Sequence, residues 1–271
     1  MKIRHQQVAG YFYSADKEKL QKDIALLLQS AKTEKSFDKI FGIVAPHAGY
    51  VYSGKTAAYV YNLLRDKTYK TVIVISPSHA EYFPGITIYD GDAYQTPLGI
   101  VELDQLMSNK LIENSKIIFR GIQGHRKEHA LEVQIPFLQS VLNEFKIVPI
   151  VMGDQSKMFV DHLAEKIASA ADENTLVVAS SDMSHFYDSD EANVLDSVVE
   201  KRINEFDFEQ LLKDLDDKEC EACGGGPIAV MMKAASLKNI NKSLVIDRSD
   251  SGDVTGDKSE VVGYLSAVVY S

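Results

Sequence analysis

Runs of consecutive apolar residues alternate along this chain with longer segments in which apolar residues recur at helical spacing. The unbroken runs predict buried strands at 40–45, 71–76, 145–151 and 175–180, short strands at 86–89 and 116–119, and closing strands at 243–246 and 261–270. The helical spacing predicts amphipathic helices at 16–31, 53–64, 103–111, 128–142, 157–170, 190–204, 207–215 and 224–234. This alternation favours an α/β fold with a mostly parallel central sheet and helices on both faces. No linker-like break interrupts the pattern, so we interpret residues 1–271 as a single domain.

Composition and charge exclude several classes of protein. With 45% hydrophobic and 25% charged residues, the chain is typical of a soluble globular protein. Its formal net charge of −10 leaves no basic face for nucleic acid. No apolar run approaches the ~18 residues of a membrane span, and the polar N-terminus has no signal-peptide pattern. The two cysteines build no disulfide framework, so we expect a cytoplasmic protein without a membrane partner.

Three histidines each follow a predicted buried strand. His47 comes after the strand at 40–45, His79 after 71–76 and His185 after 175–180. Open α/β sheets bind ligands in the crevice outside the carboxyl ends of their strands, and imidazole is the commonest metal ligand and general base near neutral pH. The pattern predicts one pocket to which all three histidines contribute. The alternative is that each is a hydrogen-bonded loop residue; for the set of three we favour the pocket.

A cysteine offers a third metal ligand. Cys223 precedes a triple glycine at a predicted helix start, where the helix dipole and free N–H groups stabilise a thiolate. His47, His79 and Cys223 would form a His₂Cys set that suits Fe(II), Zn²⁺ or Cu. His185 would act as a base beside the metal, with Asp182 orienting it or accepting a proton.

One competing motif indicates nucleotide binding. Residues 49–56 match the pattern G-x-x-x-x-G-K-[ST] after a strand and before a helix. The loop would carry the bulky Tyr50, Val51 and Tyr52 where the backbone of a nucleotide loop wraps phosphates. We therefore favour an ordinary helix start capped by Ser53.

A second competing motif indicates a zinc peptidase. Residues 125–129 match the H-x-x-E-H pattern of inverted zincins. The motif lies at the start of a predicted helix that Pro136 kinks or shortens, so we favour His125 as a surface residue. Glu128 and His129 remain candidates for outer residues that hydrogen-bond the metal-bound histidines.

Further residues near these motifs have open interpretations. Cys220 and Cys223 form a lone C-x-x-C, a pattern of redox dithiols and half zinc sites, but without a second pair we interpret Cys220 as incidental. Four aromatic residues either line an apolar pocket for an aromatic or peptide ligand or belong to the core: Tyr50, Tyr52, Phe83 and Phe186.

Seven segments in combination resemble the Memo family. They are VAGYFY at 8–13, PHAGYVYSG at 46–54, PSH at 77–79, EHALEVQ at 128–134, SSDMSHF at 180–186, CGGGPI at 223–228 and SGDVTGD at 251–257. The resemblance covers essentially the whole chain.

The resemblance implies a fold like that of the class III extradiol ring-cleaving dioxygenases, which are non-haem Fe(II) enzymes. It implies His47 and His79 as metal ligands, Cys223 at the third position and His185 as the acid/base. It also implies a radical SAM protein and an AMMECR1-like protein as partners. The dioxygenases have a carboxylate where this chain has Cys223, and a thiolate shifts the metal preference toward Cu(I), Zn²⁺ or Fe–thiolate chemistry.

Two functions are therefore expected. The first is a non-haem oxygenase or related redox enzyme that holds a divalent metal, Fe(II) ahead of Zn²⁺ or Cu, and acts on a small aromatic substrate. The second is a non-catalytic adaptor that captures a peptide in the same pocket.

Overall fold

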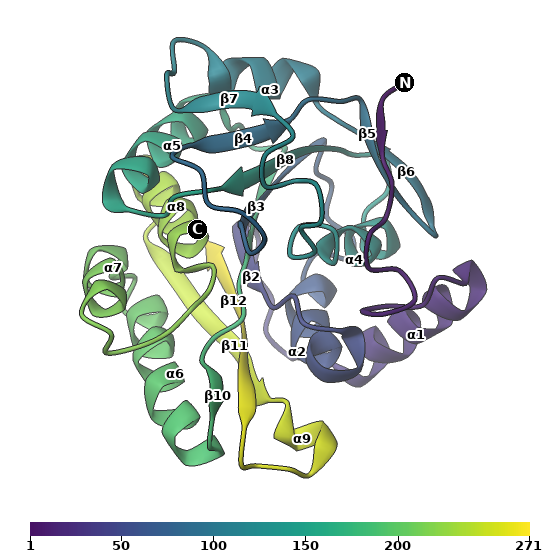
Figure 1. Ribbon diagram of the computed structural model, residues 1–271, viewed down its shortest axis with the longest axis vertical. Helices are drawn as coiled ribbons and strands as arrows, with labels where there is room; N and C mark the ends of the chain where they lie inside the picture. Colours follow the sequence, from purple (N-terminus) through teal and green to yellow (C-terminus); the bar gives the residue numbers. More distant parts are fainter.

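The apolar runs of the sequence form one nine-stranded sheet in the computed structural model, which describes residues 1–271. The strands are β2 (Ile40–Ala45), β3 (Thr71–Pro77), β4 (Ile86–Tyr89), β7 (Ile118–Gly121), β8 (Lys146–Met152), β9 (Thr175–Ser180), β10 (His185–Tyr187), β11 (Lys242–Asp250) and β12 (Val261–Tyr270). Their order in the sheet is β10-β12-β2-β9-β3-β8-β4-β7, and β11 lies off this path and also pairs with β12 (Figure 1).

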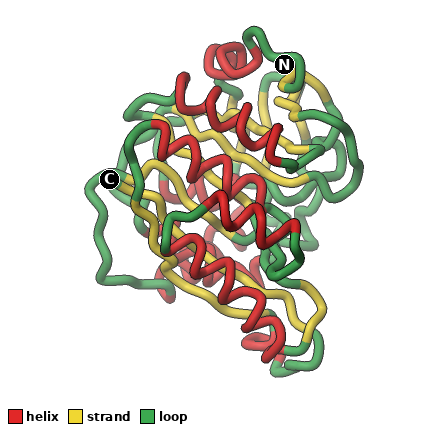
Figure 2. The backbone as a smooth tube through the Cα atoms, turned by 90° about the vertical axis from the view of Figure 1, so that its left-hand side faces the viewer, coloured by secondary structure: helices red, strands yellow, loops and turns green.

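Helices cover both faces of this sheet. One face carries α1 (Lys17–Ser30), α2 (Tyr50–Asn62) and α4 (Gln134–Val141). The other carries α3 (Gln105–Ile112), α5 (Lys157–Ala170), α6 (Ser189–Asn204), α7 (Phe208–Asp216) and α8 (Gly225–Leu237). Figure 2 views the molecule from the side and shows a layer of helices packed over the strands.

The central strands are buried on both faces, which explains their unbroken apolar runs. Along β3, Val72 and Val74 pack into the core beneath α1, α2 and α4. Ile73 and Ile75 alternate with them and pack into the core on the opposite face. Two hydrophobic cores therefore share one sheet, and the predicted α/β class is confirmed.

The sheet is mixed. Its centre, β2-β9-β3-β8, is parallel, while β12 runs antiparallel to β2 and β4 antiparallel to β8. The chain returns from β11 to β12 through the short helix α9 (Gly252–Thr255). That connection is too short for a parallel crossover, which needs about a dozen residues or more, so the pair is antiparallel.

A small second sheet was not evident from the sequence. It consists of β1 (Ile3–Arg4), β5 (Ala93–Thr96) and β6 (Gly99–Glu102), with β1 parallel to β5. These strands are only two to four residues long, too short for a periodic pattern to emerge. The sheet anchors the N-terminal segment, which continues from β1 toward the carboxyl edge of the large sheet.

Two helix starts differ from the prediction. The helix predicted at 128–142 begins only at Gln134, which leaves Pro136 in its first turn, where a missing N–H costs nothing. The helix predicted from Ser53 begins at Tyr50, so Ser53 lies inside the first turn and donates a hydrogen bond to the Ala48 carbonyl. None of the helices has the length and apolar character that a membrane crossing requires.

Candidate metal centre

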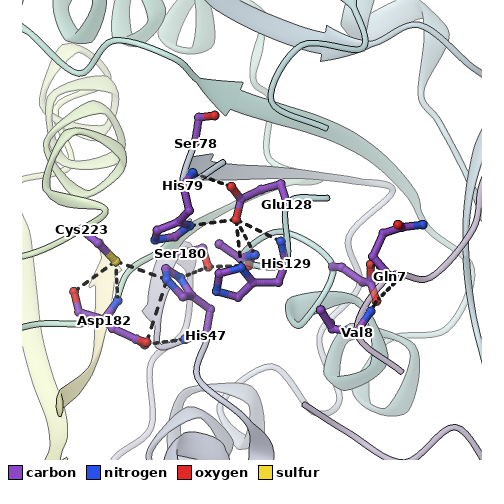
Figure 3. Close-up of polar contacts among 12 residues, drawn as sticks. Gln7, Val8, His47, Ser78, His79, Glu128, His129, Ser180, Asp182 and Cys223 are labelled. Atoms are coloured by element: carbon purple, nitrogen blue, oxygen red, sulfur yellow. Dashed lines mark hydrogen bonds and ion pairs between the residues drawn. The ribbon is translucent and has the colours of Figure 1, made fainter. Parts of the chain in front are cut away.

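The loops after three neighbouring parallel strands and the start of one helix bring four site residues together (Figure 3). His47 follows β2, His79 follows β3, Asp182 follows β9, and Cys223 precedes α8. One ligand atom each from His47, His79 and Cys223 lies within 4.8 Å of the other two. The predicted His₂Cys set is therefore close in space, at the edge of the sheet where the sequence placed it.

Hydrogen bonds indicate which nitrogen of His47 is free. Its Nδ1 lies 2.9 Å from the Ser180 Oγ. The Ser180 hydroxyl donates its only hydrogen to the Ala130 carbonyl at 2.7 Å, so it accepts from Nδ1–H of His47. The lone pair of His47 is then on Nε2, which lies 3.2 Å from the Cys223 Sγ.

Hydrogen bonds also indicate which nitrogen of His79 is free. Its Nδ1 lies 2.9 Å from Oε1 of Glu128, and its backbone N–H donates to Oε2 at 2.7 Å. An ionised carboxylate only accepts, so Nδ1 carries the hydrogen and Nε2 keeps the lone pair. A carboxylate on the outer nitrogen of a ligating histidine is the usual arrangement around protein-bound metals.

Asp182 connects His47 with Cys223. Its Oδ1 accepts from the backbone N–H of His47 at 2.7 Å and of Ala48 at 3.3 Å. Its own backbone N–H donates to the Cys223 Sγ at 3.2 Å, and its carbonyl accepts from the Cys223 N–H. No hydrogen bond joins Asp182 to His185, so in this structure Asp182 positions the two ligands rather than the predicted base.

Gly224 lets Cys223 approach this closely. A Cβ on Gly224 would lie 2.1 Å from the Ser180 carbonyl oxygen, a distance that no side chain tolerates. Because Cys223 is the adjacent residue, glycine at 224 keeps its thiol within reach of His47.

Burial and the contacts among these groups together determine their charges. It lowers the pKa of His47 to about 3 and of His129 to about 4, with the neighbouring histidines adding to both effects. Burial opposes the charge of Glu128, but hydrogen bonds and charge from His79 outweigh it and lower the pKa of Glu128 to about 2. Burial likewise opposes protonation of His79, yet its contacts with Glu128 prevail and raise the pKa of His79.

The Cys223 thiol differs from the sequence prediction. A thiolate stabilised by the helix start was expected, but burial and the nearby Asp182 raise the pKa of Cys223 well above its ordinary value. The thiol is therefore protonated at neutral pH unless a cation binds beside it. A bound metal ion deprotonates a coordinating thiol outright.

His129 completes a cluster of three imidazoles. Its ring centroid lies 4.8 Å from that of His79 and 5.4 Å from that of His47, and on its other side the Phe12 ring lies 4.8 Å away. His129 also groups with His79 and Glu128 as possible ligands. The Glu128 oxygens, however, already accept from N–H groups of His79, His129 and Ala130, which makes Glu128 an anchor for this loop.

His185 lies apart from the imidazole cluster. It and Cys223 both line a cavity of about 730 Å³, with Met183, Leu212 and Leu215 among its apolar walls. The site therefore has a cavity that reaches the candidate base and the third ligand.

The four aromatic residues predicted for a pocket differ in position. Phe83 is buried in the core and Tyr52 is exposed on α2. Phe186 is 73% exposed, and its ring lies 5.9 Å from that of His185. Tyr50 is buried in the core against Phe137, and its hydroxyl donates to the Val133 carbonyl. Phe186 is therefore accessible to a ligand, whereas Tyr50 is not.

The competing motifs have structural explanations. Residues 50–56 are helical from Tyr50, so no loop wraps a phosphate, and a Cβ on Gly54 would clash with Leu27 of α1. His125 is buried, not at the surface as expected, because β5 covers it: Nδ1 contacts the Tyr94 hydroxyl at 2.7 Å. Cys220 is a free thiol in the core.

Comparison with known proteins identifies close relatives of this chain. The family described as Memo-like protein matches residues 4–268. A MEMO1 family protein of Archaeoglobus fulgidus is 39% identical over 270 residues, covering 98% of this chain and 99% of the relative. Those of Aquifex aeolicus and Thermoplasma volcanium are 38% and 37% identical, with 99% and 98% of both chains covered.

Proposed function

We propose that this chain, which belongs to the Memo family, binds one metal ion between His47, His79 and Cys223 and uses it to oxidise a small aromatic substrate with O₂. One observation carries the proposal: both imidazoles direct the Nε2 lone pair away from a hydrogen-bonded Nδ1, and the thiol lies next to one of them. Such fixed tautomers are typical of metal ligands.

The distances fit a metal ion. Bonds of about 2.0 Å to nitrogen and 2.3 Å to sulfur at a tetrahedral angle separate the two atoms by roughly 3.5 Å. Nε2 of His47 and Sγ of Cys223 are 3.2 Å apart. The two ligands therefore need to move by only a few tenths of an ångström to share an ion.

The residues around the site would bind the substrate and move its protons. When bound, Fe(II) would supply open coordination positions and the electrons that activate O₂. The cavity beside Cys223 would hold the apolar body of the substrate against Met183 and Leu215 and exclude water. His185 would take the proton of a substrate hydroxyl as base and return it to the product as acid.

Oxygen uptake tests this function. Anaerobically purified protein loaded with Fe(II) is offered a panel of catechols and other phenols, with the protein carrying His185→Ala as the comparison. We expect uptake with at least one phenol, and about 10²–10⁴-fold slower turnover in the variant at unchanged iron content. Iron-loaded protein that consumes no O₂ with any phenol would contradict the oxygenase.

Exposed aromatic residues favour the second candidate, a peptide-binding adaptor. Tyr11, Tyr82 and Phe186 are 88%, 75% and 73% exposed. Tyr82 and Phe186 lie within three residues of His79 and His185, and Tyr11 is next to Phe12, whose ring lies 4.8 Å from that of His129. Exposed aromatic side chains are typical of protein interfaces. Peptide binding that is equally tight with and without metal, in a protein that turns over no phenol, would favour the adaptor.

A further inference from the structure

We propose that the buried ion pair of Arg4 and Glu132 is a positioning device for His79, acting through Glu128. The inference rests on the proposed metal function, and it adds residues of the N-terminal segment to the machinery of the site. Neither residue touches the three candidate ligands, so their effect is transmitted by hydrogen bonds that can be followed one at a time.

Glu132 fastens the N-terminal segment to the loop that carries Glu128 and His129. Its side chain is completely buried and accepts from the backbone N–H groups of Gln7 and Val8. It also accepts from the Tyr13 hydroxyl and from Nη1 of Arg4, both at 2.6 Å. Figure 3 shows Gln7 and Val8 to the right of His129, on the segment that Glu132 holds.

Arg4 holds the same loop at two further points. Its Nε donates to the His125 carbonyl at 2.7 Å and its Nη2 to the Glu128 carbonyl at 2.5 Å. Its guanidinium carbon lies 4.8 Å from the centre of the Tyr94 ring. All three guanidinium nitrogens are engaged, and two of them fix the backbone at and just before Glu128.

The side chain of Glu128 passes this constraint to His79. Its two oxygens accept from the Nδ1 and the backbone N–H of His79, and Oε1 also accepts from the Ala130 N–H. A shift of the Glu128 backbone therefore displaces the acceptor that sets the His79 tautomer and ring orientation. The effect on metal binding should be real but smaller than loss of Glu128 itself.

Replacing Arg4 with lysine can distinguish a positioning role of its guanidinium from a purely electrostatic one. A buried ion pair is weak evidence for stability, because desolvation offsets much of its attraction. A planar guanidinium, in contrast, presents donors in a rigid fork that one ammonium group cannot reproduce. Arg4→Lys keeps the charge opposite Glu132 and cannot keep all three directed hydrogen bonds.

The first test measures Zn²⁺ affinity by competition with a chelator and compares the wild type with Arg4→Lys and Glu132→Gln. We expect affinity about threefold to tenfold weaker in both, below the roughly 10–100-fold of a direct outer-shell partner. The control is Tyr69→Phe, which removes a buried hydrogen bond to the Ile40 carbonyl at the opposite end of β3. It should lower the thermal midpoint without changing Zn²⁺ affinity.

A double-mutant cycle tests whether Arg4 acts on His79 through Glu128. In a Glu128→Gln background, Arg4→Lys should weaken Zn²⁺ binding less than in the wild type, since coupled residues are not additive. Equal Zn²⁺ affinity in the wild type and both single variants, or an undiminished effect of Arg4→Lys in that background, would overturn the proposal.

The tautomer of His79 can be measured in the metal-free protein, so the positioning role can be tested separately from the proposed metal function. Long-range ¹⁵N–¹H spectra of the metal-free protein report which nitrogen of His79 carries the hydrogen. We expect Nδ1–H in the wild type and Tyr69→Phe, and a mixture with Nε2–H in Arg4→Lys. If the wild type binds no metal but this difference appears, the metal function fails and the positioning role stands; an unchanged tautomer overturns the positioning role.

Discussion

The carboxylate of Glu128 accepts two hydrogen bonds from His79, one from the Nδ1–H of its ring and one from its backbone N–H, across 49 residues of sequence. The pair fixes both the place of the loop after β3 and the nitrogen of His79, Nε2, that stays free of a hydrogen. This contact prepares a strand-end histidine for the metal-ligand role that we propose.

Replacing Glu128 should therefore weaken metal binding. In Glu128→Gln the amide is a poorer acceptor and carries no charge, so His79 loses its fixed tautomer. We expect Zn²⁺ affinity to fall by about 10–100-fold, measured by chelator competition. Unchanged affinity would show that the tautomer of His79 is irrelevant to binding.

Metal binding should release a proton. Burial keeps the pKa of the Cys223 thiol high, so the free protein carries the hydrogen that a metal–thiolate bond must displace. At pH 7.5, where His47 is already neutral, a pH indicator should record more proton release per Zn²⁺ bound in the wild type than in Cys223→Ala. Equal proton release in the two proteins would contradict a protonated thiol.

Mild acid should destabilise the metal-free protein through three of its buried histidines. The folded-state pKa values of His47, His125 and His129 lie near 3, 3 and 4, below the value of about 6.5 in an unfolded chain. Below about pH 6.5 the unfolded chain therefore binds protons at these histidines that the native state does not bind, and the free energy of unfolding falls as the pH drops.

The size of this effect can be measured by urea denaturation at pH 7.5, 6 and 5. Each such histidine lowers the free energy of unfolding by up to about 1.4 kcal/mol per pH unit within that window. Glu128 adds nothing there, because its stabilising effect is lost only between its unfolded value near 4.5 and about 2. The raised pKa of His79 acts in the opposite direction, since the folded state binds that proton more readily, but it is one histidine against three. A free energy of unfolding that is flat from pH 7.5 to 5 would contradict three neutral buried histidines.

The close approach at Gly224 predicts a local effect. In Gly224→Ala the new Cβ would overlap the Ser180 carbonyl, which pushes Cys223 away from His47. We expect a loss of about 1–3 kcal/mol of stability together with weaker metal binding. Gly49→Ala is the matched control, because its Cβ would meet its nearest neighbour at 3.5 Å, an ordinary contact. Equal effects of the two substitutions would count against this account.

The sequence predicted the elements better than their contacts. The helix expected at 157–170 matches α5, and the strand ends after which His47 and His79 were placed are those of β2 and β3. These features follow from local periodicity. The place of the candidate site could also be predicted, because the carboxyl ends of neighbouring parallel strands lie at the same edge of the sheet.

What the sequence did not indicate depends on contacts between distant segments. The burial of His125 comes from Tyr94 on a strand of four residues, and Ser180 acts on His47 across 133 positions. The high pKa of Cys223 arises from desolvation, which a helix-start motif does not reveal. A sequence pattern indicates which residues can act as ligands or bases. Their tautomers and charges depend on contacts that exist only in the folded structure.

The most direct test of the metal site is metal content per chain after anaerobic reconstitution with Fe(II) or Zn²⁺ and removal of excess ion. The wild type is compared with His79→Ala and Cys223→Ala, and with the matched controls His125→Gln and Cys220→Ala, which alter a buried histidine and a buried cysteine outside the ligand set. We predict about one ion per chain in the wild type and both controls, and loss of the ion in His79→Ala and Cys223→Ala. Retention of the ion in those two variants, or no stoichiometric metal in the wild type, would contradict a metal centre formed by His47, His79 and Cys223.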